Sequence, residues 1–274
     1  MIVTCHANLL CKIGNPLLRG YYMFVNGKYM RTEKVRLSVN INKIALIRNS
    51  RGGNAPDLVQ VARDCETFGA DGITIHPRPD QRHIRFNDIP ALKEVVRTEL
   101  NIEGNPTKDF MKMVLEFKPH QCTLVPDSPS ALTSDSGWDT IAQRSFLTDI
   151  VHELKDGGIR VSIFINADTK MVEGAAKAGA DRIELYTGPY AAQYKADPYG
   201  AVKDHAEAAR IASLSGIGVN AGHDLNLDNL RYYMQNLPNL LEVSIGHALV
   251  CDALYYGLGN VISMYQHQLR DIPS

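Results

Sequence analysis

FGADGITI (residues 68–75) and AGADRIEL (residues 178–185) are near copies of each other. Each joins the end of an amphipathic helical pattern to a short β-rich run. A glycine after such a pattern is typical of a helix end, and a β-branched apolar run is typical of a buried parallel strand. An internal echo of this kind indicates repeated strand–helix units.

The same alternation continues from residue 36 onward. Helical patterns separate the β-rich runs, and Asp57 and Asp168 stand where helix caps are expected. The predicted strands are Arg36 to Asn42, Gly72 to His76, Asn101 to Glu103, Gln121 to Pro126, Arg160 to Asn166, Arg182 to Thr187, Gly218 to Gly222 and Leu241 to His247. Eight such units predict an α/β protein, a single-domain (β/α)8 TIM barrel with largely apolar strands. A doubly wound open sheet is the alternative, but the chain lacks the G-x-G-x-x-G turn usual in that fold.

Composition limits the kind of protein. The chain has 274 residues, of which 45% are hydrophobic, so it can bury a large core. Its net charge of −1 provides no general attraction to nucleic acid or acidic lipid, and we expect neither as a partner. No apolar run approaches the roughly 18 residues that a membrane-spanning helix needs.

The cysteines and the N-terminus favour the cytoplasm. Five cysteines are scattered without a C-x-x-C pair or zinc-type spacing, as is typical of reduced thiols. Lys12, Gly14, Pro16 and Arg19 interrupt the first apolar stretches, unlike a secretory signal.

The first 34 residues show neither a helical nor a strand period. We therefore expect an N-terminal extension at 1–34 and a catalytic barrel at 35–274. Two interpretations stay open: an additional arm, or an over-long start with the natural start at Met30.

Polar side chains end most of the predicted strands. In a barrel these ends form the mouth that carries the active site. His, and a Glu whose pKa is raised by burial, are the groups that proton transfer needs, so several of them at one mouth indicate catalysis. The strand-end residues are Asn40, Asn42, Lys43, His76, Arg78, Glu103, Asn166, Glu184, Thr187, His223, Gly246 and His247.

Two regions favour phosphate binding. NAGHD (220–224) and IGHA (245–248) follow the last two strands, where backbone N–H groups and a helix N-terminus often hold phosphate. Arginines and a histidine suggest a second anion site, made of Arg48, Arg51, Arg78, Arg82 and His83. Two anion sites around a His and Glu centre imply two phosphorylated substrates. The long connection Pro126 to Asp139 is a lid or clamp candidate.

Neither a metal nor a cofactor is expected. His76, Glu103, His223 and His247 lack the spacing of familiar metal motifs. Lys43 is either a rim or phosphate contact, which we favour, or a Schiff-base lysine as in aldolase barrels.

From Leu37 to about Gln268 the chain resembles the pyridoxine 5′-phosphate synthase family of vitamin B6 biosynthesis. The resemblance rests on ordered blocks: VNINKIALIRNSRGG, GADGITIHPRPDQRHI, LNIEGNP, KPHQCTLVP, VSIFINAD, IELYTGPYA, VNAGHDLN and IGHAL. It implies a TIM barrel, usually a homo-octamer. The implied reaction joins 1-deoxy-D-xylulose 5-phosphate and 3-amino-2-oxopropyl phosphate into pyridoxine 5′-phosphate, phosphate and water.

The resemblance also implies roles for individual residues. His76 and Glu103 would be proton acceptors and His223 a proton donor. The amino ketone phosphate would contact Asn40, Arg51, Gly246 and His247. The deoxyxylulose phosphate would contact Arg78, His83 and Thr133.

Three residues depart from the family pattern. Asn42 and Lys43 replace an Asp-His pair that contacts the deoxyxylulose phosphate, and Lys43 can still donate a hydrogen bond. Asp224 replaces a Gly, so we expect its backbone to keep a contact with the amino ketone phosphate and its carboxylate to point away. The alternatives are an aldolase or isomerase that uses Lys43, and a degenerate barrel kept as a scaffold.

Overall fold

A computed structural model describes residues 22–25, 28–31, 34–127 and 134–270. It divides into two compact units, Met1–Lys34 and Val35–Ser274. In the first unit, β1 (Tyr22–Val25) pairs antiparallel with β2 (Lys28–Arg31). The sequence analysis expected no regular element there. Asn26-Gly27, a pair typical of two-residue hairpin loops, is the signal that could have identified this hairpin. The position of the natural start stays a prediction.

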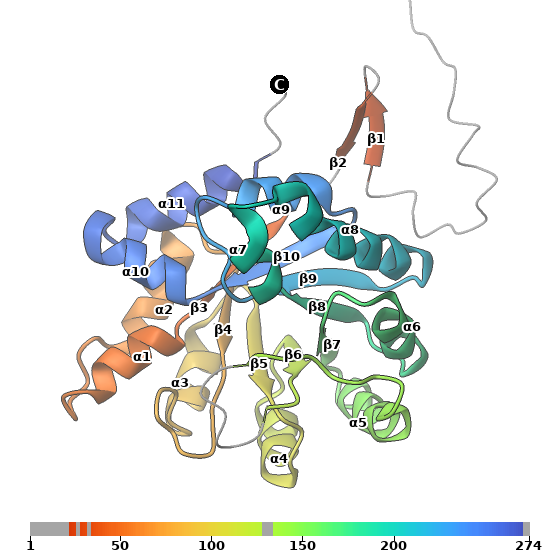
Figure 1. Ribbon diagram of the computed structural model, residues 1–274. Helices are drawn as coiled ribbons and strands as arrows, with labels where there is room; N and C mark the ends of the chain where they lie inside the picture. Colours follow the sequence, from red (N-terminus) through yellow and green to blue (C-terminus); the bar gives the residue numbers. More distant parts are fainter. Residues whose placement is uncertain (1–21, 26–27, 32–33, 128–133, 271–274) are drawn as a thin grey trace, which may run out of the picture. The chain divides into compact units, whose positions relative to one another are not determined.

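The second unit is a closed barrel of eight parallel strands, which confirms the predicted TIM barrel and excludes the open sheet (Figure 1). Neighbouring strands follow the chain order, and the last strand closes on the first, with Ile245 beside Val39. The strands are β3 (Arg36–Asn40), β4 (Gly72–Ile75), β5 (Leu100–Gly104), β6 (Gln121–Leu124), β7 (Arg160–Ile165), β8 (Arg182–Tyr186), β9 (Gly218–Gly222) and β10 (Leu240–Ile245).

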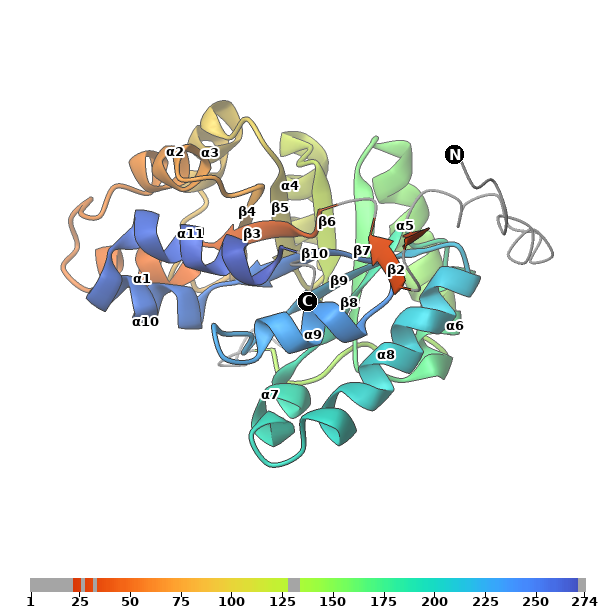
Figure 2. The same ribbon diagram turned by 90° about the horizontal axis from the view of Figure 1, so that it is seen from above.

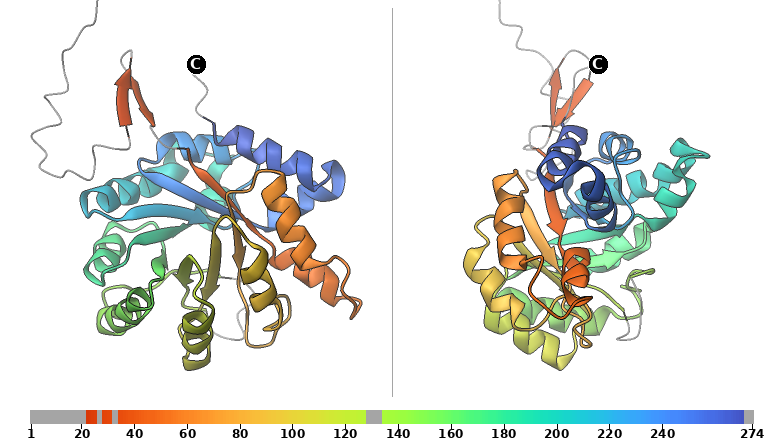
Figure 3. Two further views of the ribbon diagram at one scale, coloured as in Figure 1. Left: turned by 180° about the vertical axis from the view of Figure 1, so that it is seen from behind. Right: turned by 90° about the vertical axis from the view of Figure 1, so that its left-hand side faces the viewer.

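Helices surround the strands in chain order (Figure 3). Asp57 and Asp168 cap α2 and α6 through backbone N–H groups, as the sequence predicts. The helices are α1 (Asn42–Asn49), α2 (Leu58–Thr67), α3 (Asp88–Val95), α4 (Lys108–Phe117), α5 (Arg144–Asp156), α6 (Thr169–Lys177), α7 (Gly188–Tyr194), α8 (Pro198–Leu214), α9 (Leu230–Asn236), α10 (His247–Tyr256) and α11 (Leu258–Gln268). Among the helices described, none combines the length and the apolar character needed to cross a membrane.

The two near copies in the sequence form the same turn. Asp71 accepts a hydrogen bond from the Leu37 N–H at 3.0 Å, and Asp181 accepts one from the Val161 N–H at 2.9 Å. Each aspartate thereby ties the start of its strand to the preceding strand. The glycines two residues earlier have φ of +104° and +87°, which glycine adopts without strain. The echo therefore encodes a repeated connection from helix to strand.

The described side chains inside the barrel are largely polar, and they alternate along each strand with the apolar core residues that the sequence predicts, such as Leu37 and Val39 on either side of Ser38. Alternate side chains on each strand face the interior. Thr123 on β6 donates to Asn101 at 3.1 Å and lies 3.5 Å from a Glu184 oxygen on β8, a strand that is not its neighbour. Ser38 and Thr74 form a further hydrogen bond at 2.7 Å. These hydrogen-bonded polar side chains thus fill the barrel interior, where many barrels have Val, Ile and Leu.

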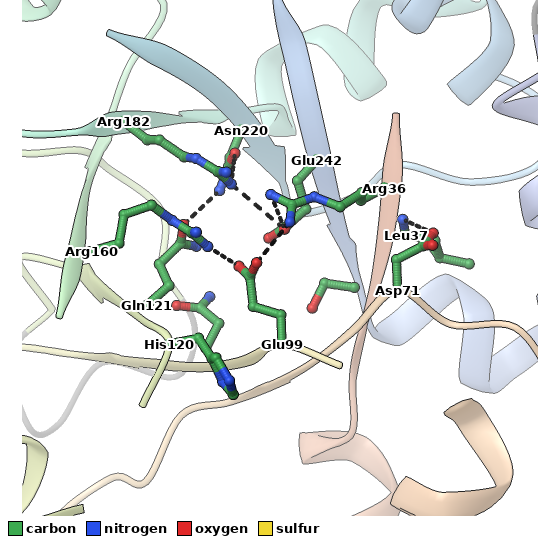
Figure 4. A network of polar contacts seen from close by, with 12 residues as sticks. Arg36, Leu37, Asp71, Glu99, His120, Gln121, Arg160, Arg182, Asn220 and Glu242 are labelled. Carbon is green, nitrogen blue, oxygen red and sulfur yellow. Dashed lines mark hydrogen bonds and ion pairs between the residues drawn. The ribbon is translucent and has the colours of Figure 1, made fainter. Parts of the chain in front are cut away.

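Charged side chains gather at the amino-terminal end of the barrel (Figure 4). Glu99 lies between Arg36, at 2.9 Å, and Arg160, which also donates to it. Glu242 lies 3.5 Å from Arg36 and 3.7 Å from Arg182. Because both carboxylates are buried, each depends on these guanidinium groups to offset the loss of water. We call this cluster of Arg36, Glu99, Arg160, Arg182 and Glu242 the barrel floor.

The buried carboxyls predict how stability changes with pH. Burial, and then the nearby Glu242, raise the pKa of Glu184 to about 8. Burial, and then Glu99, raise the pKa of Glu242 to about 7. A raised pKa in the folded state stabilises the protein fully below the unfolded pKa, and this contribution is lost as the pH rises through the folded pKa. We therefore expect the free energy of unfolding to fall between pH 5 and pH 8, by at most about 1.4 kcal/mol per pH unit for each group.

Urea unfolding of the wild type and of Glu184→Gln at pH 5 and pH 8 checks this expectation. The Gln variant should lose part of the pH dependence, whereas Glu94→Gln on the exposed side of α3 should keep all of it. If the free energy of unfolding of Glu184→Gln depends on pH as strongly as that of the wild type, the pKa of Glu184 is the same in the folded and unfolded chains, and the expectation is wrong.

Candidate active site

A histidine and a glutamate face each other at the mouth. His76 follows β4 and Glu103 lies on β5, and His76 Nδ1 is 3.9 Å from Glu103 Oε2. The backbone N–H of His76 donates to Asn42 Oδ1 at 3.0 Å, which fixes the chain at this point. The side chains are 9% and 12% exposed, so bulk water screens the pair little.

Burial sets the protonation of this pair. It lowers the pKa of His76 well below the usual range, with further contributions from Arg78 and His83. It raises the pKa of Glu103 well above the usual range, with further contributions from the carboxylates of Glu184 and Asp127. At neutral pH these directions favour a neutral imidazole beside a protonated carboxyl.

Arg78 lies next to the pair and is buried. It donates to Asp127 Oδ2 at 2.6 Å, and Ser134 donates to the same oxygen at 2.5 Å. Asn105 donates to the Asp127 carbonyl at 3.1 Å. Asp127 therefore joins the loop after β6 to a predicted substrate-binding arginine. Asp127 and Ser134 belong to the connection that the sequence predicts as a lid or clamp, but no individual role was predicted for them or for Asn105, which directly follows β5.

His83 is neutral and has a fixed tautomer. Burial, and then Arg78, lower the pKa of His83 to about 4. Its Nδ1 accepts a hydrogen bond from the backbone N–H of Ile84 at 3.0 Å, so the ring proton is on Nε2. The His83 ring lies 6.3 Å from that of His76, centroid to centroid. His83 is thus a neutral hydrogen-bond donor at the mouth.

Arg48 does not act as the sequence analysis expected. Its side chain is buried and donates to both Asp88 oxygens, at 2.7 and 2.9 Å, and to the His83 carbonyl at 3.1 Å. A guanidinium held by two carboxylate oxygens has little capacity left for a substrate anion. Arg48 instead holds the loop that carries His83, and Arg82 pairs with Asp80 at 3.4 Å.

His223 stands directly after β9. Its charge contributes to lowering the pKa of His76, so the two histidines are close enough to interact electrostatically. The His223 ring lies 5.3 Å from the Tyr186 ring in an edge-on arrangement. The Asp224 carboxylate lies 3.7 Å from His223 Nδ1, and this interaction lowers the pKa of Asp224. The carboxylate thus faces the histidine, and its direction relative to a bound substrate stays a prediction.

The segment after β10 leads into a helix, at whose N-terminus the sequence predicts an anion site. Gly246 precedes the first turn of α10, and His247 begins the helix. A Cβ on Gly246 would lie 3.1 Å from Asn40 Cβ, so the absent side chain lets these two strand ends approach closely. Asn40 Oδ1 accepts the N–H of Asn42 at 3.0 Å. His247 contributes to the lowered pKa of Asp224, so it belongs to the same mouth.

The remaining predicted residues differ in their placement. Lys43 is exposed in the first turn of α1, close enough to contribute to the lowered pKa of His83. Arg51 is exposed in the loop after α1, and no described side-chain contact joins it to His76 or Glu103. Thr133, and with it the centre of the predicted lid, lies outside the described residues. Within the described ranges, no three His, Cys, Asp or Glu side chains converge as a metal site would require.

Known proteins resemble this chain closely. The family model of the pyridoxal phosphate biosynthesis protein PdxJ matches residues 37–271. A pyridoxine 5′-phosphate synthase from Cytophaga hutchinsonii is 61% identical over 235 residues, which are 86% of this chain and 99% of that protein. The protein of the same name from Flavobacterium johnsoniae is 55% identical over the same shares of both chains.

Solved structures support the fold alone. Orotidine 5′-monophosphate decarboxylase from Methanocaldococcus jannaschii aligns with a TM-score of 0.59 at 11% identity, over 87% of this chain and 100% of that one. Thiamine phosphate pyrophosphorylase from Pyrococcus furiosus aligns with a TM-score of 0.56 at 12% identity, over 86% and 95%. The sequence matches are far more specific, and on their evidence the chain belongs to the PdxJ family of pyridoxal phosphate biosynthesis proteins.

Proposed function

We propose that this chain is a pyridoxine 5′-phosphate synthase. It condenses 1-deoxy-D-xylulose 5-phosphate with 3-amino-2-oxopropyl phosphate, and releases pyridoxine 5′-phosphate, inorganic phosphate and water. The observation that carries the proposal is the buried His76 and Glu103 pair, 3.9 Å apart, at a mouth that also holds His223. The close relatives of the same name support it.

The chemistry consists largely of proton transfers. The amine of one substrate and the carbonyl of the other form an imine, water and phosphate are eliminated, and an enol carbon closes the ring. Neutral His76 is ready to accept a proton at the addition and elimination steps. Glu103 begins protonated, so it first gives its proton and then accepts one, as a shuttle does. His223 protonates a departing group.

Two groups of residues hold the two phosphates. Arg78 and His83 supply a cation and a neutral donor for the deoxyxylulose phosphate, together with Thr133. The first-turn N–H groups of α10, which begins at His247, supply donors for the amino ketone phosphate. Asn40, Gly246 and Arg51 complete that second group.

Asn42, Lys43 and Asp224, which depart from the family pattern, each have a role in the proposed reaction. Asn42 uses its oxygen to hold the His76 backbone and retains its amide N–H₂ for substrate. Lys43 replaces an imidazole by an ammonium beside the deoxyxylulose phosphate. Asp224 keeps its backbone toward the amino ketone phosphate while its carboxylate faces His223. The proposal includes no cofactor and no metal. The enzyme works in the cytoplasm and assembles as a homo-octamer. Nucleic acid and membranes are not among its partners.

Product formation by His76→Ala and His223→Ala tests the assignment. Each substitution should lower kcat by about 10²- to 10⁴-fold, the usual contribution of a proton-transfer residue. The measurement is formation of pyridoxine 5′-phosphate from both substrates, followed by chromatography. Rates near that of the wild type in both variants would contradict these roles.

A Lys43 substitution separates this function from a Schiff-base aldolase. Because Lys43 is exposed and acts here only as a phosphate or hydroxyl contact, Lys43→Ala should raise KM for the deoxyxylulose phosphate by about 3- to 10-fold and leave kcat nearly unchanged. Steady-state kinetics with each substrate varied in turn measures both constants. A collapse of kcat, with a borohydride-trapped adduct on wild-type Lys43, would favour the aldolase.

A further inference from the structure

The turn that carries His223 has an unusual backbone. His223 has φ of +79° and Asp224 has φ of +25°, and neither residue is a glycine. The left-handed region costs free energy for residues with a Cβ, so a turn with two such residues persists only when its surroundings hold it. Which groups hold this turn is therefore a functional question, because the turn sets the direction of the His223 imidazole.

Thr187 holds the turn from the β8 side. Its hydroxyl lies 2.7 Å from the Gly222 carbonyl oxygen and 2.6 Å from the His223 carbonyl oxygen. Its backbone N–H also donates to the Gly222 carbonyl, at 3.1 Å. These contacts fix the residue before the turn and the first residue in it.

Asn229 holds the turn from the other side. Its Nδ2 donates to the Asp224 carbonyl at 3.2 Å, and its Oδ1 accepts the Asn226 N–H at 2.9 Å. One amide group therefore bridges the exit of the turn. Asn229 is only 2% exposed, so water cannot readily replace either bond.

The neighbouring helices keep Asn229 in place. Tyr190 on α7 donates its hydroxyl to the Asn229 carbonyl at 2.7 Å, and the Tyr190 ring packs 4.8 Å from that of Tyr233 on α9. Tyr233 is in turn bonded to buried His205 on α8 at 2.9 Å. Figure 2 shows these three helices side by side. The backbone of Asn229 is thus held by a packed aromatic cluster.

We propose that Asn229 is a positioning residue, which holds the left-handed turn at His223 and Asp224 so that the imidazole is directed at the substrate. The proposal rests on the proposed function, because it acts through the proton-donor role of His223. It predicts that loss of the Asn229 bond impairs the chemical step, while the contacts of Arg78 and His83 with the deoxyxylulose phosphate stay intact.

Asn229→Asp is the sharpest variant. It keeps an acceptor for the Asn226 N–H but replaces the Nδ2 donor by an oxygen that faces the Asp224 carbonyl. We expect kcat to fall by about 10- to 100-fold, the size of effect that a small misplacement of a reacting group produces, with KM for the deoxyxylulose phosphate within about 3-fold of the wild-type value. Asn236→Asp is the matched control, since Asn236 lies exposed at the end of α9, the helix that Asn229 precedes, and its side chain donates to the Tyr232 carbonyl. It should leave both constants unchanged.

The decisive comparison uses a His223→Ala background. If Asn229 acts through His223, Asn229→Asp should lower kcat by less than about 2-fold there, because coupled residues are not additive. An equal fall in both backgrounds, or an unchanged kcat in the single variant, would overturn the proposal. If circular dichroism shows that the Asp variant is unfolded, Asn229→Ala takes its place, because it removes the donor without adding a charge. Its kcat must then fall in the wild-type background and stay nearly unchanged in the His223→Ala background. Failure of the wild type to form product would instead overturn the proposed function itself.

Discussion

Glu103→Gln is expected to lower kcat by about 10²- to 10⁴-fold, the range for loss of a general acid–base group. The amide fills the same volume but can neither give up nor accept a proton at this step. Because burial raises the pKa of Glu103 well above its usual range, it favours the uncharged form of the wild-type carboxyl, which the amide resembles. The substitution should therefore leave the free energy of unfolding unchanged at pH 7. Steady-state kinetics and urea unfolding on the same preparations measure both quantities.

Glu116→Gln is the control for this change, because it makes the same replacement of a carboxyl by an amide at an exposed position on α4. It should keep the wild-type kcat. A Glu103→Gln enzyme that turns over at the rate of Glu116→Gln would show that Glu103 is a structural residue, and the shuttle would have to be sought elsewhere.

Glu99→Leu is expected to lower the free energy of unfolding by about 3–5 kcal/mol, as when one partner of a buried ion pair is removed. Glu99 lies in the barrel floor between Arg36 and Arg160. Burial opposes the charge of this carboxylate, yet Arg160 and Arg36 outweigh burial and lower the pKa of Glu99. Without Glu99, the guanidinium groups of Arg36 and Arg160 would lose the negative charge that offsets their mutual repulsion.

Urea unfolding at pH 7 measures this effect. Glu207→Leu is the matched control, since Glu207 pairs with Arg210 at 2.7 Å on the exposed side of α8, where water screens the pair. It should shift the midpoint little. A Glu99→Leu midpoint equal to that of the control would mean that the barrel floor contributes no stability.

The fold was largely predictable because its signals are local. The Gly-Ala-Asp echo repeats one connection from helix to strand, in which Asp71 and Asp181 make equivalent bonds. The meeting of His76 and Glu103 was predictable for a related reason, since the carboxyl ends of parallel strands must meet at one mouth. Strand position predicts where these two side chains lie, whereas their catalytic roles come from the family resemblance and stay a prediction.

The partners of individual side chains were not predictable, because they depend on distant residues. The sequence predicts that Arg48 binds an anion, but its guanidinium donates hydrogen bonds to both carboxylate oxygens of Asp88, 40 positions away. Arg78 likewise meets Asp127, 49 positions away. At the barrel floor, Glu99 and Arg160 resemble surface charges beside a strand until the closure of the barrel buries them together.

One measurement tests the central claim most directly: the yield of pyridoxine 5′-phosphate and of inorganic phosphate when the purified chain is given both phosphorylated substrates. The account predicts equal amounts of the two products, at a rate proportional to enzyme, and none of either when one substrate is omitted. Phosphate release without the ring product, or no turnover with both substrates present, would contradict it.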